Sequence, residues 1–163
     1  MLEFDTRRND CPLCGSTVDV PVDMTGVMTE MPKLISRSFR EPRSHEGLGW
    51  TPHEVASHLA DAEVVLGWRI RQIFSEDEPM LQPFDQDVWA AKLNYGDREL
   101  ATSLATFAAN RQANLELLRF AGDAGLERKY RHPEFGNRPL RALIEHIADH
   151  DILHLRQIRG EGD

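Results

Sequence analysis

Apolar residues recur at three- and four-residue steps in four stretches of this chain, which is the spacing of one face of an α-helix. We expect helices over residues 23–40, 51–75, 97–121 and 139–159. A chain of 163 residues suits one domain with one core. The pattern predicts an all-α fold, a four-helix bundle over residues 22–163 that follows an irregular N-terminal segment, residues 1–21.

The helix boundaries are marked most clearly at "TPHE". Thr51 is the expected N-cap, Pro52 the first helical residue and Glu54 the returning partner of a capping box. Asp97 is the expected N-cap of the third helix, and Gly122 and Gly125 are expected to end it. These signals set the expected lengths of the two central helices.

The connection over residues 76–96 is long for a helical bundle, and loops of this size in compact domains are often functional lids. It contains Phe84, Trp89 and Tyr95. Two interpretations of these aromatic side chains stay open. They line a substrate pocket, or they cap the bundle core.

The composition limits the classes of ligand. The formal net charge is −8, which disfavours binding to the phosphate backbone of nucleic acids. The sequence has no glycine-rich phosphate loop and no apolar run of the roughly 18 residues that a membrane span needs. We expect a cytoplasmic protein that acts on a small molecule, without a nucleic-acid or membrane partner.

Three histidines follow one another at four-residue steps in "HIADHDILH". With Leu140 at zero on a helical projection, His154 lies about 40° from the centre of the apolar face, His150 about 80° and His146 about 120°. The first two therefore face the core edge, and His146 turns towards solvent. A similar projection of the second helix places His58 about 60° from its apolar centre.

Three inward imidazoles from two helices form a candidate site for one divalent metal ion, and Zn²⁺, Ni²⁺ and Fe²⁺ all accept such ligands. We add Mn²⁺ to the candidates. Three protein ligands leave a coordination position for water or substrate, as in catalytic zinc sites. Each histidine taken alone would fit equally well as a hydrogen-bonded core residue.

Two charged residues fall on inner helix faces, Arg111 on the third helix and Asp151 on the fourth. A buried charge is costly unless it is paired, so we expect an ion pair between them beside the metal. Asp61, one turn after His58, is a further candidate for a residue that supports the ligands. A solvent-exposed position explains Asp61 equally well.

The only two cysteines, Cys11 and Cys14, stand in "CPLCG". The spacing is that of half a zinc site, and it predicts a second zinc ion whose other ligands the sequence does not identify. A pair of free thiols in the N-terminal segment is the competing interpretation. Both stay open at this stage.

Two motifs together resemble the DinB/YfiT-like superfamily, "GWTPHEVASHLADAE" at 49–63 and "HIADHDILHLRQI" at 146–158. The segment "ATFAANRQANLELL" is similar to that family's third helix. The resemblance covers about residues 22–160. It implies an up-down-down-up bundle, often homodimeric, with a divalent metal on His58, His150 and His154 but not on His146.

The activities of that superfamily include thiol-dependent S-transferases, isomerases and proteins described as metal-dependent hydrolases. We expect a metal-dependent enzyme and favour the transferase, with a low-molecular-weight thiol as cosubstrate, because no carboxylate is clearly placed as a general base. A hydrolase and a non-catalytic metal-stabilised sensor are the alternatives. Ile152 and Leu153 are expected on the outer side of the last helix, which favours a homodimer.

Overall fold

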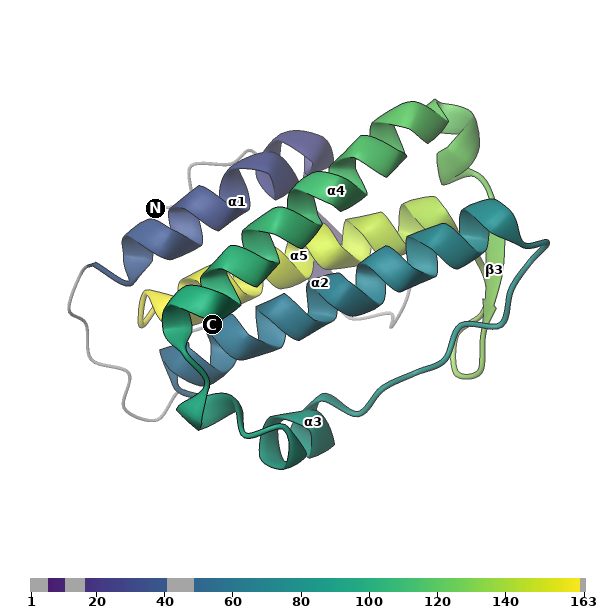
Figure 1. Cartoon of the computed structure of the whole chain (residues 1–163). Helices are drawn as coiled ribbons and strands as arrows, with labels where there is room; N and C mark the ends of the chain where they lie inside the picture. The colour runs from purple at the N-terminus through teal and green to yellow at the C-terminus, as the bar shows by residue number, and fades with distance from the viewer. Residues whose placement is uncertain (1–5, 11–16, 41–48, 162–163) are drawn as a thin grey trace.

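Four long helices form a bundle in the computed structural model, which describes residues 6–10, 17–40 and 49–161. They are α1 (Met24–Ser38), α2 (Pro52–Ser75), α4 (Leu100–Leu126) and α5 (Leu140–Ile158) (Figure 1). The short helix α3 (Gln86–Lys92) and the 3₁₀ turn η1 (Tyr95–Asp97) lie in the connection between α2 and α4. The predicted four-helix bundle is confirmed.

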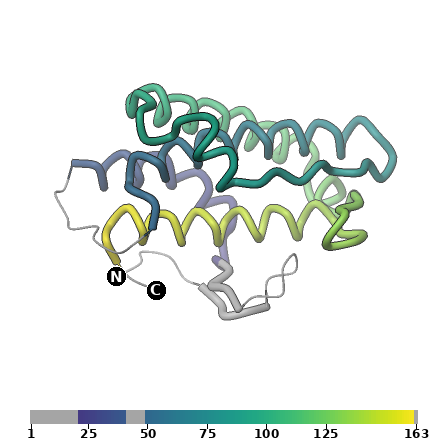
Figure 2. The backbone as a smooth tube through the Cα atoms, turned by 90° about the horizontal axis from the view of Figure 1, so that it is seen from below, coloured from purple at the N-terminus to yellow at the C-terminus, as the bar shows by residue number. Residues whose placement is uncertain are grey.

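The order of directions is up-down-down-up, as Figure 1 shows. Helices α2 and α4 run parallel and pack against each other, whereas α1 and α5 run the opposite way. Two adjacent parallel helices cannot be joined by a tight turn. The chain therefore returns along the length of the bundle between them, and this explains the long connection predicted over residues 76–96 (Figure 2).

Two antiparallel hairpins accompany the helices. Strands β1 (Thr6–Asp10) and β2 (Thr17–Pro21) pair with each other, so part of the N-terminal segment that was expected to be irregular forms an antiparallel hairpin. Residues 11–16, with both cysteines, lie outside the described residues, and the second zinc site stays a prediction. Strands β3 (Lys129–His132) and β4 (Gly136–Pro139) form the second hairpin, between α4 and α5.

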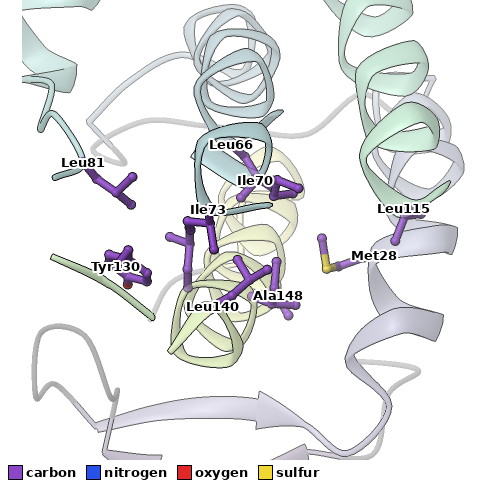
Figure 3. Close-up of a cluster of buried hydrophobic side chains, with 11 residues drawn as sticks. Met28, Leu66, Ile70, Ile73, Leu81, Leu115, Tyr130, Leu140 and Ala148 are labelled. Atoms are coloured by element: carbon purple, nitrogen blue, oxygen red, sulfur yellow. The ribbon is translucent and has the colours of Figure 1, made fainter. Parts of the chain in front are cut away.

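The core joins the helices to the long connection. Leu81 of the connection and Tyr130 of β3 are fully buried in the apolar cluster of Figure 3. The other labelled members come from the four bundle helices: Met28, Leu66, Ile70, Ile73, Leu115, Leu140 and Ala148. Backbone hydrogen bonds from Leu81 N to Arg131 O (2.8 Å) and from Arg131 N to Pro79 O (2.9 Å) hold the connection against β3.

The outer face of α5 differs from the prediction. Ile152 is 1% exposed and packs with residues of α1 and α2 in a second apolar cluster. Only Leu153 of the two is exposed, at 43%. Helix α1 packs against α5, so this side of α5 is an inner one. The homodimer stays a prediction, now without the argument from Ile152.

The ends of α4 also differ from the prediction. The helix begins at Leu100, and Asp97 lies in η1, where its carboxylate accepts a hydrogen bond from Asn94 Nδ2 (2.9 Å). At its other end α4 continues past Gly122 to Leu126, with a non-helical backbone at Gly122 (φ 60°). Glycine tolerates this positive φ at little cost, and the helix resumes after it.

The start of α2 agrees with the prediction and gives a direct test. Thr51 Oγ1 accepts from the Glu54 backbone N–H (3.3 Å), and a Glu54 carboxylate oxygen accepts from the Thr51 N–H (2.8 Å). Thr51→Ala is expected to lower the free energy of unfolding by about 0.5–2 kcal/mol in urea titrations. Thr51→Ser, which keeps the hydroxyl, is the control. Equal stability of the alanine and serine variants would show that the cap contributes nothing.

Candidate metal centre

Three histidine side chains meet between α2 and α5. His58 comes from α2, and His150 and His154 lie one turn apart on α5. His150 Nε2 is 2.8 Å from His58 Nε2 and 3.1 Å from His154 Nε2. They are the one group of three or more potential ligands that the described residues bring within 4.8 Å of one another. The helical spacing therefore led to the correct set of neighbours.

Burial keeps these imidazoles neutral at neutral pH. Burial and, secondarily, the nearby His154 lower the pKa of His58 to about 3. Burial and the surrounding histidines also hold the pKa of His150 well below its usual value. The pKa of His154 is lowered by burial, against a smaller opposite effect of Gln157. All three rings thus have an unprotonated nitrogen, which metal binding requires.

Two neighbours that the sequence analysis missed orient the rings. Gln157 Oε1 lies 2.9 Å from His154 Nδ1, and Gln157 Nε2 donates to Trp50 O at 3.4 Å. Because the amide oxygen accepts, the proton of His154 stays on Nδ1 and the lone pair of Nε2 faces the other two histidines. Trp50 also covers His58 edge-on, with ring centroids 5.0 Å apart.

A cleft of about 210 Å³ opens onto His58 and His150. Its walls come from α2, the long connection, the β3–β4 hairpin and α5. Besides the two histidines, its polar lining comprises Arg69, Gln86, His132, Glu134 and His146. The apolar lining consists of Ala62, Val65, Leu66, Pro83, Phe84, Phe135, Leu143 and Ile147.

Two further histidines line the cleft. His146, expected to turn towards solvent, is half-buried and lies with its ring centroid 6.3 Å from that of His150. His132 of β3 is only 7% exposed, and its ring stacks on that of Phe135 with centroids 4.6 Å apart. Burial lowers the pKa of both, and Arg69 lowers it further.

The three aromatic residues of the connection divide between the two interpretations that were left open. Phe84 lines the cleft, and Trp89 packs against it with ring centroids 4.8 Å apart. Tyr95 is fully buried in the bundle, and its backbone oxygen accepts a hydrogen bond from Ser57 Oγ (3.1 Å). Phe84 therefore lines the cleft with Trp89 packed behind it, and Tyr95 belongs to the bundle core.

The model of the DinB superfamily matches residues 31–158. The chain belongs to the DinB superfamily. A protein of Oceanobacillus iheyensis named "Putative metal-dependent hydrolase OB0782" is 30% identical over 115 residues, which cover 71% of this chain and 66% of that protein. "Putative metal-dependent hydrolase BcerKBAB4_2443" of Bacillus mycoides is 28% identical over 110 residues, covering 68% and 63%.

Both matches span slightly less than two thirds of these curated relatives. Among solved structures, YfiT from Bacillus subtilis superposes with a TM-score of 0.76 at 22% identity, covering 83% of this chain and 81% of that one. Its description names a probable metal-dependent hydrolase with an unusual four-helix bundle topology. At this identity the likeness supports the shared fold, and the DinB assignment rests on the family match.

Behind the histidines of this DinB superfamily member lies a buried ionic network. Arg111 donates to both carboxylate oxygens of Asp151 (2.6 and 3.1 Å), to Glu63 Oε2 (2.8 Å) and to Met28 O (3.1 Å). The pairing of Arg111 with Asp151 agrees with the sequence interpretation, whereas Glu63 was missed. Burial raises the pKa of Asp151, and Arg111 offsets part of that rise. Because Asp151 follows His150 directly, the network holds that part of α5 in place.

Asp61 does not face the histidines. Its Oδ1 forms an ion pair with Arg98 Nη1 (2.8 Å), which ties α2 to the end of the long connection. Neither Asp61 nor Asp151 lines the cleft. Both carboxylates are ion-paired with arginines, so neither is placed to act as a general base at the histidines.

No helix of the described residues is long and apolar enough to cross a membrane.

Proposed function

We propose that this DinB superfamily member is a metal-dependent hydrolase of small molecules, with one divalent ion held by His58, His150 and His154. The observation that carries the proposal is the meeting of three neutral Nε2 atoms beside a cleft that two of the residues, His58 and His150, line. A bound ion would act there as a Lewis acid and lower the pKa of a water molecule. Zn²⁺, Ni²⁺, Fe²⁺ and Mn²⁺ remain candidates.

The chain's own residues would contribute orientation and proton transfer. Gln157 holds the proton of His154 on Nδ1, and Trp50 covers His58. His146 lines the cleft beside His150, and we assign it the role of proton acceptor for the attacking water. An imidazole in this position supplies the general base that neither Asp61 nor Asp151 provides.

The hydrolase is preferred to the thiol-dependent transferase that the sequence analysis favoured. That preference relied on the lack of a general base for hydrolysis, and His146 offers such a base. The names of the relatives also describe metal-dependent hydrolases, and they give no support to a thiol cosubstrate. The cleft, moreover, is smaller than the roughly 300–1,000 Å³ of typical ligand pockets, which leaves little room for a thiol and a second substrate together.

His146→Asn tests the proposal with a separate readout of metal content. After loading with Zn²⁺, Mn²⁺ or Ni²⁺, the unaltered protein is expected to turn over members of a panel of small esters and amides without added thiol. His146→Asn is expected to lower kcat by about 10²–10⁴-fold, because it removes the proton acceptor, and to retain its metal. His53→Asn, at the exposed start of α2, is the control.

Turnover that requires a thiol would overturn the hydrolase in favour of the transferase. Unchanged kcat in His146→Asn would remove His146 from the mechanism.

A further inference from the structure

Arg69 is the one cationic side chain that lines the cleft. It lies eleven residues after His58 on α2, which places it on the same helical face roughly 16 Å further along the axis. Helix α5 runs antiparallel to α2, so His146, one turn before His150, extends from the histidine cluster towards Arg69. The cleft thus has His58 and His150 at one end and a guanidinium at the other.

The guanidinium of Arg69 is held in place but its charge is not balanced. Its Nη2 donates to Gln82 O (2.8 Å), and its Cζ lies 5.9 Å from the centroid of the Phe84 ring. Its Nε is buried and has no hydrogen-bond acceptor among the described residues. No described carboxylate forms an ion pair with it, although Glu134 lines the same cleft.

Arg69 differs from Arg111 in its charge partners. The Nε of Arg111 also has no acceptor among the described residues, but two carboxylates and a backbone oxygen accept hydrogen bonds from its Nη atoms. Arg69 is half-buried and has one backbone oxygen as acceptor. A partly buried cation without a carboxylate partner is costly unless a ligand supplies one. Arginine binds carboxylate and phosphate groups well because its planar fork offers parallel N–H donors.

We infer that Arg69 is an anion-binding subsite, and that the substrate is a small molecule carrying a carboxylate or phosphate group at the end remote from the three histidines. His132 and His146 also line the cleft, and both lie near enough to Arg69 for its charge to contribute to lowering their pKa. The inference rests on the proposed function for the location of the reacting bond. The anion subsite itself depends only on Arg69 and its surroundings.

Binding is tested first, without relying on turnover. Benzoate and phenylphosphonate serve as probes and benzamide as their neutral match, in ligand-observed NMR titrations of the protein before and after removal of metal by a chelator. Arg69→Gln is expected to weaken binding of both anions by about tenfold or more, the effect of losing charge-assisted hydrogen bonds, and to leave benzamide unchanged. Arg69→Lys should recover part of the loss, because it restores the charge but not the fork.

Arg71→Gln is the matched control. Arg71 lies two residues away on α2 but donates to Gly67 O and Asn114 Oδ1 instead of lining the cleft. Circular dichroism and thermal unfolding show whether each variant is folded. Equal anion binding by the unaltered protein and a folded Arg69→Gln variant, or a loss as large in Arg71→Gln, would overturn the inference.

Turnover is tested second, with a pair of esters that differ only in a remote charge: the monomethyl ester of a short dicarboxylic acid and the neutral dimethyl ester. Arg69→Gln is expected to reduce kcat/KM for the charged ester by tenfold or more, mainly through KM, and to spare the neutral one. Arg69-dependent anion binding without turnover of any ester would contradict the hydrolase but support the subsite. Ester turnover without Arg69-dependent anion binding would support the hydrolase but contradict the anion subsite.

Discussion

Arg111→Met is expected to lower the free energy of unfolding by about 3–5 kcal/mol, the cost of removing one partner from a buried ionic network. Arg111 is 1% exposed and lies between the carboxylates of Glu63 and Asp151, both of them buried. Its removal leaves these two acidic groups facing each other without a cation. Methionine has a similar length, so the loss of packing is small. Urea denaturation followed by circular dichroism measures the change.

The control replaces the whole network. A triple variant with Arg111→Met, Glu63→Met and Asp151→Leu is expected to regain most of the lost stability, because apolar groups of similar volume carry no desolvation penalty. Arg111→Lys should remain destabilised, since lysine cannot make the two parallel bonds to Asp151. A cost below about 1 kcal/mol for Arg111→Met would show that water reaches the two carboxylates and that the network is not closed.

His150→Ala is expected to remove nearly all bound metal. His150 Nε2 is the central atom of the three, close to both His58 and His154. Its loss leaves only two metal-ligating nitrogens at the site. Elemental analysis after dialysis should fall from about one equivalent per chain to near zero. The rise in melting temperature on adding metal should also disappear, because that rise reflects binding to the folded state.

His53→Ala, an exposed histidine at the start of α2, is the control for the metal measurement and should keep the full equivalent. Retention of all metal in both His150→Ala and His154→Ala would rule out the proposed site. Additional metal that survives both substitutions would instead point to the cysteines of the N-terminal segment.

The parts of the site that the sequence could predict lie on regular helices. His58, His150 and His154 could be brought together on paper because a residue's direction on an α-helix follows from its number. The same projection placed Arg111 and Asp151 on inner faces. The capping residues of α2 were equally clear, since Thr51, Pro52 and Glu54 act within one turn.

The parts that the sequence could not predict depend on contacts between distant segments. An acidic residue such as Glu63 on a helix usually faces solvent, and only the position of Arg111 on α4 explains its burial. His132 is buried in a strand that is hydrogen-bonded to the long connection, and Asp97 lies in the 3₁₀ turn that contains the fully buried Tyr95. The periodicity of apolar residues within one helix or strand does not show such contacts between distant segments. For Glu63, the one available signal was its position two turns after the inward residue Val55.

Part of the cleft wall comes from elements that carry none of the proposed metal ligands. All three proposed ligands belong to α2 and α5, whereas Phe84 and His132 come from the connection and the hairpin. Those two segments are fixed to the core by Leu81 and Tyr130. Mutation between these anchors can therefore change which molecules enter while the ligands and the ionic network remain intact.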